Sequence, residues 1–360
     1  MRKKIFSGIN WLVMLVTCSS CGKVIDASKS ESYYVKQGSV YFIPGGNSFE
    51  RGSKKMDADP KSFQPLAETY GKDSRHVYFR GSKQEHIDAG SFQIANGLPK
   101  DKSYVYCYHG GDIDFNRRGE DVLSIIEQAD PSTFQRLDAP ATGFAKDRNH
   151  YYYRNRLISV DYKSFQILNV RFMKDDEKLY LDNGEQFLVV DKSLKEAEIV
   201  NKEYVLVDGN KLFYFQPFKK EGVIVSPLSP NSLPIEVVDD DLLKTREEVF
   251  LFGRPIPGAD PKTLQVLFKT KTELIAKDKK HVYYNLEVIP LANPKTYQLL
   301  DGRVGKDDRF VYYTNKKIDV PDIEGFRKVT DSSMQNVTFQ DNKGNVYDAW
   351  AVKQESKSSR

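Results

Sequence analysis

The feature that most constrains this chain is a short motif that recurs along nearly its whole length. A Lys-Asp doublet is followed, after three variable residues, by an aliphatic or aromatic residue and then by a tyrosine. Six copies carry this tyrosine, at Tyr78, Tyr106, Tyr152, Tyr180, Tyr283 and Tyr312. Weaker copies place Tyr41, Tyr214, Phe250 and Tyr347 at the equivalent position, which makes about ten units. Units of this size cannot bury their apolar faces alone, so the repetition predicts a stacked array.

A second element keeps step with the first. It has the form Asp-Pro-x-Ser/Thr-Phe-Gln, as in DPKSFQ (59–64) and DPSTFQ (130–135). The phenylalanine-type residue follows the lysine of the preceding copy by 20 positions in three pairs: Lys72 and Phe92, Lys277 and Tyr297, Lys306 and Phe326. The regular spacing predicts units of roughly 28–37 residues.

The copy FAKDRNHYYYRNRLISVDYKSFQIL (144–168) shows how each unit is expected to fold. The carboxylate of Asp147 can accept a bond from the backbone N–H two residues on, which starts a turn. Residues 150–153 follow as a short aromatic strand, and Phe165 is a core anchor before a further strand. We therefore expect an all-β chain, a tandem array of β-hairpin repeats that forms either a curved stack or a propeller-like body. Tyrosines stacked in this way would more simply fill the core than bind a glycan or an extended peptide.

The pattern resembles the DKNYY family, a group of repeat-bearing bacterial proteins named for the motif matched here by Lys-Asp followed by Tyr-Tyr. The resemblance covers about residues 33 to 348, nearly the whole chain after the leader. It implies no enzymatic activity, and it supplies no catalytic residues. The copies at 173–181 and 202–215 depart most from the pattern, which predicts an irregular middle of the array.

Residues 1–22 have the pattern of a secretory leader. Arg2, Lys3 and Lys4 precede an apolar stretch at 9–16, which is followed by small residues. A transmembrane helix needs about 20 apolar residues, so this stretch is short for a membrane span. The end of the leader resembles the lipobox of bacterial lipoproteins, in which a small residue precedes a cysteine that becomes lipidated and N-terminal.

Two cysteines compete for the lipid. Cys21 follows the small residues 19–20, but Cys18 stands where leucine is usual. Cys18 has Leu15 at the right place, but Thr17 is a poor residue directly before the cut. We expect lipid attachment at Cys21, with Cys18 as the alternative and an ordinary cleaved leader as the third interpretation. Several acyl chains would hold the folded body at a membrane surface.

Charge and cysteine content narrow the functional classes. The formal net charge of +4 includes the three leader cations, and without them 51 Lys and Arg residues face 50 Asp and Glu residues. This balance gives no indication of nucleic-acid binding. Cys107 takes the repeat position held elsewhere by Phe79, so we expect a small core residue there. One cysteine outside the leader supports neither a disulfide framework nor a metal cluster.

Two stretches interrupt the array. Residues 108–129 contain about 14 extra residues, and their second half shows a helical i, i+3, i+4, i+7 spacing of apolar residues at Val122, Ile125, Ile126 and Ala129. This predicts one short inserted helix near 120–129. Residues 216–243 are expected to be a loop or a boundary between two subarrays. Insertions in repeat proteins sometimes form a binding face, although a decorated loop without a ligand is the simpler interpretation.

The first interruption holds the candidate ligand site. In HGGDID, His109 stands beside Asp112 and Asp114, and carboxylate oxygens suit Ca²⁺, although a full ligand loop is missing. The other histidines are less promising, because His76, His150 and His281 share one repeat position that elsewhere holds Tyr104, Lys178 and Phe310. The run 239–241 of three aspartates is interpreted as a solvated loop. We assign no catalytic residue, cofactor or metal ligand.

These observations predict the following organisation: a lipoprotein signal peptide at 1–20, an N-terminal array at 33–215 with its insertion at 108–129, a loop or boundary at 216–243, a C-terminal array at 244–348 and a polar tail at 349–360. The expected function is that of a non-enzymatic binding or scaffold module of a bacterial cell envelope, attached to the membrane through its N-terminal lipid. In a Gram-negative cell the outer membrane or cell surface is the expected location. An envelope protein or a glycan is the expected partner. The alternative is a carbohydrate-active or other enzyme, or an accessory protein, with its site at 108–129.

Overall fold

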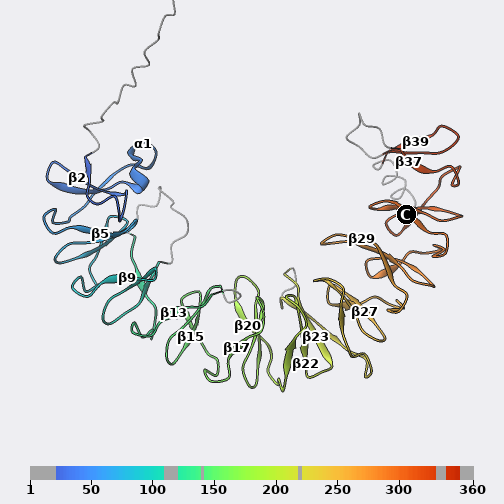
Figure 1. Ribbon diagram of the computed structural model, residues 1–360, viewed down its shortest axis with the longest axis horizontal. Helices are drawn as coiled ribbons and strands as arrows, with labels where there is room; N and C mark the ends of the chain where they lie inside the picture. The colour runs from blue at the N-terminus through green and yellow to red at the C-terminus, as the bar shows by residue number, and fades with distance from the viewer. Residues whose placement is uncertain (1–21, 109–120, 139–141, 218–220, 330–337, 349–360) are drawn as a thin grey trace, which may run out of the picture. The chain divides into compact units, whose positions relative to one another are not determined.

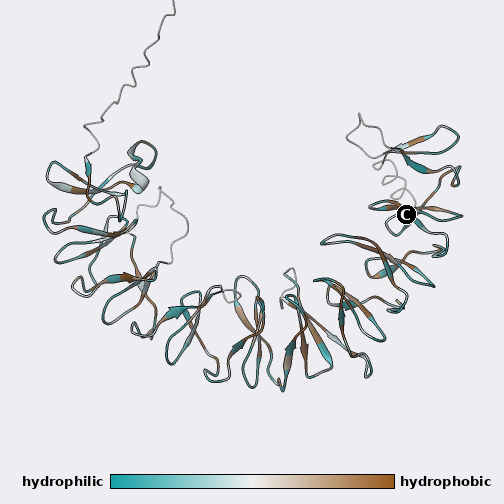
Figure 2. Ribbon diagram, in the orientation of Figure 1, coloured by the Kyte–Doolittle hydropathy of each residue, from teal (hydrophilic) through white to brown (hydrophobic). Residues whose placement is uncertain are grey.

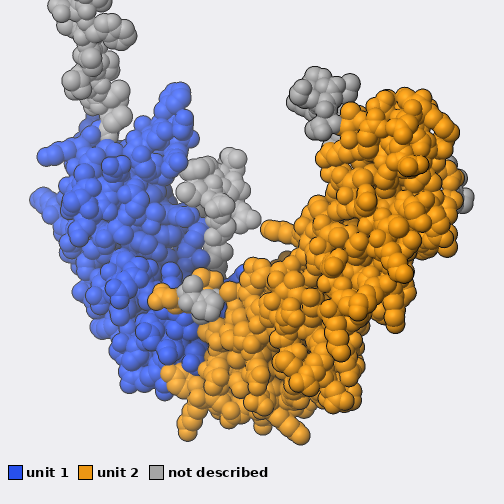
Figure 3. Space-filling model, turned by 45° about the vertical axis from the view of Figure 1, so that its right-hand side comes forward, with its two compact units in different colours: residues 1–137, 143–159 blue, residues 138–142, 160–360 orange. Residues whose placement is uncertain are grey.

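The structure is a computed structural model that describes residues 22–108, 121–138, 142–217, 221–329 and 338–348 (Figure 1). It divides into two compact units, shown in blue and orange in Figure 3. Unit 1 comprises residues 1–137 with 143–159, and unit 2 comprises residues 138–142 with 160–360. Within each unit, small antiparallel sheets follow one another along the chain.

The strands of unit 1 are β1 (Lys23–Val24), β2 (Tyr33–Lys36), β3 (Ser39–Phe42), β4 (Lys54–Lys55), β5 (Gln64–Ala67), β6 (Tyr70–Lys72), β7 (Val77–Phe79), β8 (Ser82–Gln84), β9 (Gln93–Ala95), β10 (Leu98–Lys100), β11 (Tyr106–Cys107), β12 (Ser124–Ile125), β13 (Gln135–Arg136), β14 (Phe144–Lys146), β15 (Tyr151–Tyr153) and β16 (Arg156–Ile158). A 3₁₀ turn, η1 (Pro44–Gly46), and a one-turn helix, α1 (Ser48–Arg51), lie between β3 and β4. The sequence did not predict these two short elements.

The strands of unit 2 are β17 (Gln166–Ile167), β18 (Phe172–Lys174), β19 (Leu179–Asp182), β20 (Phe187–Asp191), β21 (Ala197–Ile199), β22 (Tyr204–Val207), β23 (Lys211–Phe215), β24 (Val223–Pro227), β25 (Glu236–Val237), β26 (Leu242–Lys244), β27 (Val249–Leu251), β28 (Arg254–Pro255), β29 (Gln265–Lys269), β30 (Leu274–Lys277), β31 (Val282–Tyr284), β32 (Glu287–Val288), β33 (Gln298–Asp301), β34 (Val304–Lys306), β35 (Val311–Tyr313), β36 (Lys316–Ile318), β37 (Arg327–Val329), β38 (Thr338–Gln340) and β39 (Val346–Asp348).

The repeating unit is a four-stranded meander in which each strand pairs with the next. We name its strands a, b, c and d in chain order, as in β5, β6, β7 and β8. The third sheet is split into β9–β10 and β11–β12, which are joined by an isolated bridge between Lys100 and Val105. Counted as one, they bring the sheets among the described residues to ten, the last with three strands. The all-β repeat predicted from the sequence is confirmed.

Turn chemistry explains why each c strand folds back into a d strand. Arg80 and Gly81, between β7 and β8, have φ values of 47° and 73°. Arg154 and Asn155, between β15 and β16, have φ values of 49° and 63°. Two successive left-handed residues form a type I′ turn, whose twist matches that of the flanking strands.

Aromatic residues fill the space between consecutive sheets of each unit. The tyrosines of the six strong copies are at most 1% exposed. The phenylalanine-type anchors are also buried, and the Phe63 ring lies so close to Gly71 that a Cβ there would meet it at 2.4 Å. In unit 1, for example, Val77 and Phe79 pack with Phe92 and Tyr106 of the next sheet. Hydrophobic residues lie mainly on the strands and hydrophilic residues mainly on the turns (Figure 2). The predicted core roles are confirmed for the strong copies, whereas Tyr41 and Tyr347 of the weaker copies are only partly buried.

The predicted helix near 120–129 is wrong. Ser124 and Ile125 form β12, which pairs antiparallel with β11. The Gln84 side chain fixes this strand, because its Oε1 accepts from the Leu123 N–H at 2.8 Å and its Nε2 donates to the Asp121 carbonyl at 2.7 Å. Leu123 and Ile126 point into the core, so the apolar spacing that suggested a helix reflects a short strand and its flanks.

The second interruption was predicted to be a loop or a boundary between two subarrays. Residues 216–243 contain β24 and β25 and the start of β26, joined by loops, and the subarray boundary stays a prediction. The two compact units divide near residues 137–160. Whether the whole array is open or closed stays a prediction. Among the described residues, none belongs to a helix that is both long and apolar enough to cross a membrane.

Candidate functional site

The Lys-Asp doublet is the centre of a hydrogen-bond arrangement that the unit repeats. In the turn between β6 and β7, Asp73 Oδ1 accepts from the backbone N–H groups of Arg75 and His76, at 2.8 and 2.7 Å. Asp73 Oδ2 accepts from the Tyr78 hydroxyl at 2.9 Å and from the backbone N–H of Asp59 at 3.1 Å. Asp59 starts the preceding Asp-Pro-Lys-Ser turn, so one buried carboxylate joins two turns and a strand.

The same four bonds recur in the other strong copies, at Asp101, Asp147, Asp175, Asp278 and Asp307. The tyrosine hydroxyl lies 2.5–3.0 Å from the carboxylate in all six. The N–H from the preceding turn lies 2.8–3.2 Å away. A carboxylate has about four accepting positions, and each of these is used. The predicted turn-forming role of the aspartate is confirmed.

The hydrogen bonds favour the ionised form of five of these aspartates, Asp73, Asp101, Asp147, Asp175 and Asp278. Burial alone would raise the pKa of Asp73, but four hydrogen bonds to the charged form together lower it below its ordinary value. The pKa values of Asp101, Asp147, Asp175 and Asp278 are lowered for the same reasons. Burial, and then the bond to Asp73, raise the pKa of Tyr78. The tyrosine is therefore a neutral donor to a charged acceptor.

The lysine of the doublet bonds to the turn that follows its sheet, whereas the aspartate bonds to the turn that precedes it. Lys72 Nζ donates to the carbonyls of Ala89 and Phe92, at 3.0 and 3.1 Å, in the turn that follows its sheet. Lys277 makes the equivalent bonds to Pro294 and Tyr297. In these two copies the lysine touches the residue 20 positions later, which explains their 20-residue spacing, whereas Lys306 Nζ donates to the carbonyls of Ile323 and Glu324.

The three histidines of the repeat and Cys107 pack against other side chains of the fold. His76, His150 and His281 are half-buried beside the tyrosines of their own strands. Cys107 is 5% exposed, and burial raises the pKa of its thiol. The core role predicted for this cysteine is confirmed.

The candidate ligand residues His109, Asp112 and Asp114 lie outside the described residues, as do Cys18 and Cys21. The base of the insertion is described. Tyr108 on one side donates its hydroxyl to Asp121 Oδ1 on the other, at 2.6 Å. The Arg80 guanidinium lies 4.7 Å from the centre of the Tyr108 ring, and 3.9 Å from Asp121. The chain therefore leaves and re-enters the third sheet at a closed, hydrogen-bonded neck.

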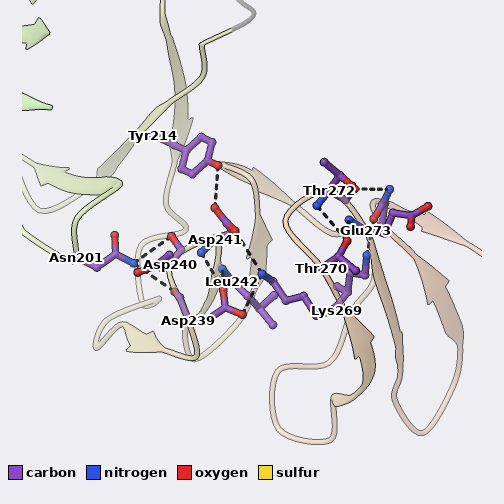
Figure 4. A network of polar contacts seen from close by, with 12 residues as sticks. Asn201, Tyr214, Asp239, Asp240, Asp241, Leu242, Lys269, Thr270, Thr272 and Glu273 are labelled. Carbon is purple, nitrogen blue, oxygen red and sulfur yellow. Dashed lines mark hydrogen bonds and ion pairs between the residues drawn. The ribbon is translucent and has the colours of Figure 1, made fainter. Parts of the chain in front are cut away.

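The largest departure from the repeat among the described residues is a polar network in unit 2, shown in Figure 4. Lys269 Nζ, at the end of β29, lies 3.1 Å from Asp239 Oδ2 and 3.3 Å from Asp241 Oδ2. Asp241 Oδ1 accepts from the Tyr214 hydroxyl at 3.0 Å. Burial, and then the negative charge of Asp241, raise the pKa of Tyr214. Asp239 and Asp241 of the aspartate run are thus bound to Lys269 and Tyr214, whereas the sequence suggested a solvated loop.

Wider a–b turns in the middle of the array make this network possible. Asn169 Oδ1 accepts from two backbone N–H groups of its own turn, and its Nδ2 donates to the Asn201 carbonyl at 2.9 Å. Asn201 repeats the arrangement one sheet later, and its Nδ2 lies 3.3 Å from the carbonyls of Asp239 and Asp240. Successive a–b turns are therefore linked side chain to backbone from Asn169 to Asp240, and the last link, to Lys269, joins two side-chain carboxylates to an ammonium group.

The sequence analysis missed this series, although a signal was present. Asn169, Asn201 and Asp239 each stand three residues before the first buried residue of a b strand. Aligning these turns would have placed the three residues at one repeat position. The contact to Lys269 depends on the register of neighbouring sheets and had no sequence signal.

Both the repeated aspartates and the network around Lys269 stabilise the fold. The repeated carboxylates have no accepting position left, and the Lys269 ammonium group lies between two carboxylates and 6.0 Å from the centre of the Phe252 ring. Within the part of the chain that the structure describes, no group of three or more His, Cys, Asp and Glu side chains has the geometry to hold a metal ion.

Comparison with known proteins gives one finding. The family model described as the DKNYY family matches the chain three times, over residues 6–110, 117–216 and 242–354. No curated protein matches the chain.

Proposed function

The chain belongs to the DKNYY family, and on this premise we propose that it is an envelope-anchored β-repeat lipoprotein that acts as a non-enzymatic binding or scaffold module. The observation that carries the proposal is the use of the repeated polar residues. Asp73 and its five counterparts accept hydrogen bonds from turns and tyrosines at all their accepting positions. Four of the doublet lysines donate to the turns that follow their sheets. The repeat thus builds a series of small sheets with many exposed turns.

A series of small sheets joined by exposed turns suits binding better than catalysis. Stacked repeats present the same turns at regular intervals, and variation at those turns changes the surface without changing the core. Among the described residues the wide turns from Asn169 to Lys269 differ from the other repeats, and residues 109–120 interrupt the repeat in the sequence.

The membrane attachment rests on the leader, with its cationic start, its apolar stretch and small residues before Cys21. The test is labelling with radioactive palmitate in cells that express the wild-type chain, Cys21→Ser or Cys18→Ser. We expect label in the wild type and in Cys18→Ser, and none in Cys21→Ser. Label that persists in Cys21→Ser and disappears in Cys18→Ser moves the anchor to Cys18. A wild-type chain without label refutes the lipoprotein proposal.

The second candidate function is an enzyme or carbohydrate-active accessory protein with its site at 108–129. The neck favours a self-contained insertion, because Tyr108 and Asp121 already lie within hydrogen-bond distance. The structure also defines the deletion that tests it. Removing residues 109–120 and joining Tyr108 to Asp121 by a Gly-Ser link spares β12, whereas a deletion reaching residue 128 removes that strand.

Binding of the wild type and the deleted chain is then compared on an array of envelope glycans. Circular dichroism and urea unfolding are the controls for folding. Loss of glycan binding with folding intact supports a site in the insertion. Turnover of a bound glycan that disappears in Asp112→Asn or Asp114→Asn refutes the non-enzymatic proposal.

A further inference from the structure

The first sheet begins almost at the proposed anchor. β1 starts at Lys23, so one residue, Gly22, separates the sheet from Cys21. Two residues of extended chain span at most about 7 Å. A lipid attached at Cys21 therefore leaves no linker, and the first sheet is held at the bilayer surface.

The element beside β1 presents an aromatic ring to solvent. Phe49, in α1, is 99% exposed. Its position relative to β1 follows from Tyr34, which pairs with Val24 of β1 and whose hydroxyl would lie 2.7 Å from a Cβ at Gly46 in η1. The segment η1–α1 therefore lies over β2, next to the start of the sheet.

Local structure fixes the ring in this outward position. The Asn47 side chain caps α1, because its Oδ1 accepts from the Glu50 N–H at 3.1 Å and its Nδ2 donates to Glu50 Oε2 at 2.8 Å. Gly52 ends the helix with a φ of 67°. Phe49 thus lies on a one-turn helix that Asn47 caps at its start and Gly52 ends. An aromatic ring placed on a capped turn and left without protein contacts is suited to an apolar environment outside the protein.

The charge around the ring suits an anionic surface. Residues 22–56 contain six Lys or Arg residues and three Asp or Glu residues, whereas the chain after the leader is nearly neutral. Arg51 and Lys55 follow Phe49 closely and are exposed, whereas Lys54 Nζ donates to Ser82 Oγ at 2.6 Å. Basic residues beside an apolar anchor are attracted to anionic lipid headgroups.

We propose that the first sheet is a membrane-contacting surface, in which Phe49 inserts into the headgroup region of the bilayer and Arg51 and Lys55 meet anionic headgroups. This inference rests on the proposed lipid anchor. The lipid holds the sheet in place, and the aromatic and basic residues fix which side of the sheet meets the membrane.

The test uses the mature, lipidated full chain reconstituted into vesicles of phosphatidylcholine and phosphatidylglycerol. Phe49→Trp is made together with Trp350→Phe, since the other tryptophan, Trp11, leaves with the leader. The vesicles contain phosphatidylcholine brominated on its acyl chains, which quenches an indole near the interface. The matched control is Tyr104→Trp with Trp350→Phe, because Tyr104 is exposed on the third sheet of the same unit.

We expect the brominated lipid to quench the Phe49→Trp emission about twofold, with a blue shift, because an interfacial side chain lies some 5–10 Å into the headgroup boundary. The Tyr104→Trp emission should stay unchanged. Adding Arg51→Glu and Lys55→Glu should reduce the quenching in anionic vesicles. Palmitate label and vesicle flotation are measured on the same samples. A labelled, floating protein without quenching refutes the membrane-contacting surface alone, whereas an unlabelled protein refutes the anchor and this inference together.

Discussion

Replacing one repeated aspartate by asparagine should weaken the array by a calculable amount. In Asp147→Asn, the amide oxygen can still accept the N–H groups of Asn149 and His150, which lie 2.8 and 2.7 Å from Oδ1. The amide nitrogen would replace Oδ2, which now accepts from the Asp130 N–H at 3.0 Å and the Tyr152 hydroxyl at 2.8 Å. The substitution therefore places a donor against two donors.

The magnitude follows from these two contacts. A buried N–H without an acceptor costs about 1–3 kcal/mol, and a hydrogen bond to a charged group contributes about 1.5–3 kcal/mol. The Tyr152 hydroxyl can rotate and accept from the new amide, so part of the second contribution is recovered. We expect the free energy of unfolding to fall by about 2–3 kcal/mol. Asp57→Asn is the control, because the Asp57 side chain is 95% exposed and should have almost no effect.

The effect should also depend on pH, with a definite sign. The pKa of Asp147 is lowered in the folded protein, since hydrogen bonds from Asp130, Asn149, Tyr152 and His150 outweigh the effect of burial. Its stabilisation is therefore complete above the unfolded pKa of about 3.9 and is lost as the pH falls through the lower folded pKa. The difference between wild type and Asp147→Asn should be largest near pH 7 and shrink below about pH 4.

The assay is equilibrium urea unfolding of the mature chain, followed by circular dichroism at pH 7 and at pH 3. Hydrogen exchange at the Asp130 amide reports the local effect directly. A loss below about 0.5 kcal/mol at pH 7 would show that the carboxylate does not hold the two turns together. An equal loss at both pH values would mean that ionisation of Asp147 is not the cause.

Three further predictions concern other parts of the chain. Tyr297→Phe should leave thermal stability unchanged or raise it, because the buried Tyr297 hydroxyl has no hydrogen-bond partner among the described residues. Tyr312→Phe should cost about 1.5 kcal/mol, because it removes a hydrogen bond to a carboxylate. Equal melting temperatures of the two variants would refute the distinction. Lys269→Met should destabilise unit 2 by about 1–2 kcal/mol, because the carboxylates of Asp239 and Asp241 would lose the cation that they share; urea unfolding measures this, and an unchanged free energy of unfolding would contradict it. Cys107 should react with a thiol reagent only on unfolding, since it is buried with a raised pKa, so rapid labelling of the native chain would count against its core position.

The repeat made much of the fold predictable from the sequence. The aspartate turn, the buried tyrosine and the phenylalanine anchor all follow from residue type and spacing, and Asp147, Tyr152 and Phe165 have the positions expected of them. These features are local, or they recur often enough for the repetition to identify the core side. The function of the 20-residue spacing was not predicted, because the donation from Lys72 to the Phe92 carbonyl depends on how one sheet packs on the next.

Non-local contacts also explain the errors. Residues 122–129 have the spacing of a helix, but a strand forms because β11 and the Gln84 side chain offer backbone partners from an earlier part of the chain. In the same way, the acidic run at 239–241 looked solvated, because its lysine partner lies 28 or more residues away in sequence. Neither partner is identifiable from local composition.

The Lys-Asp doublet has a consequence for how such a chain can lengthen. The aspartate binds the turn before its sheet, and the lysine binds the turn after it, as with Asp73 to Asp59 and Lys72 to Phe92. A duplicated segment that runs from one doublet to the next carries both halves of this connection and fits its neighbours at once. A break elsewhere leaves a buried carboxylate or an ammonium group without its partner. Gene duplication in this lineage is therefore expected to add or remove whole periods, and chain length in related proteins should change in steps of one unit.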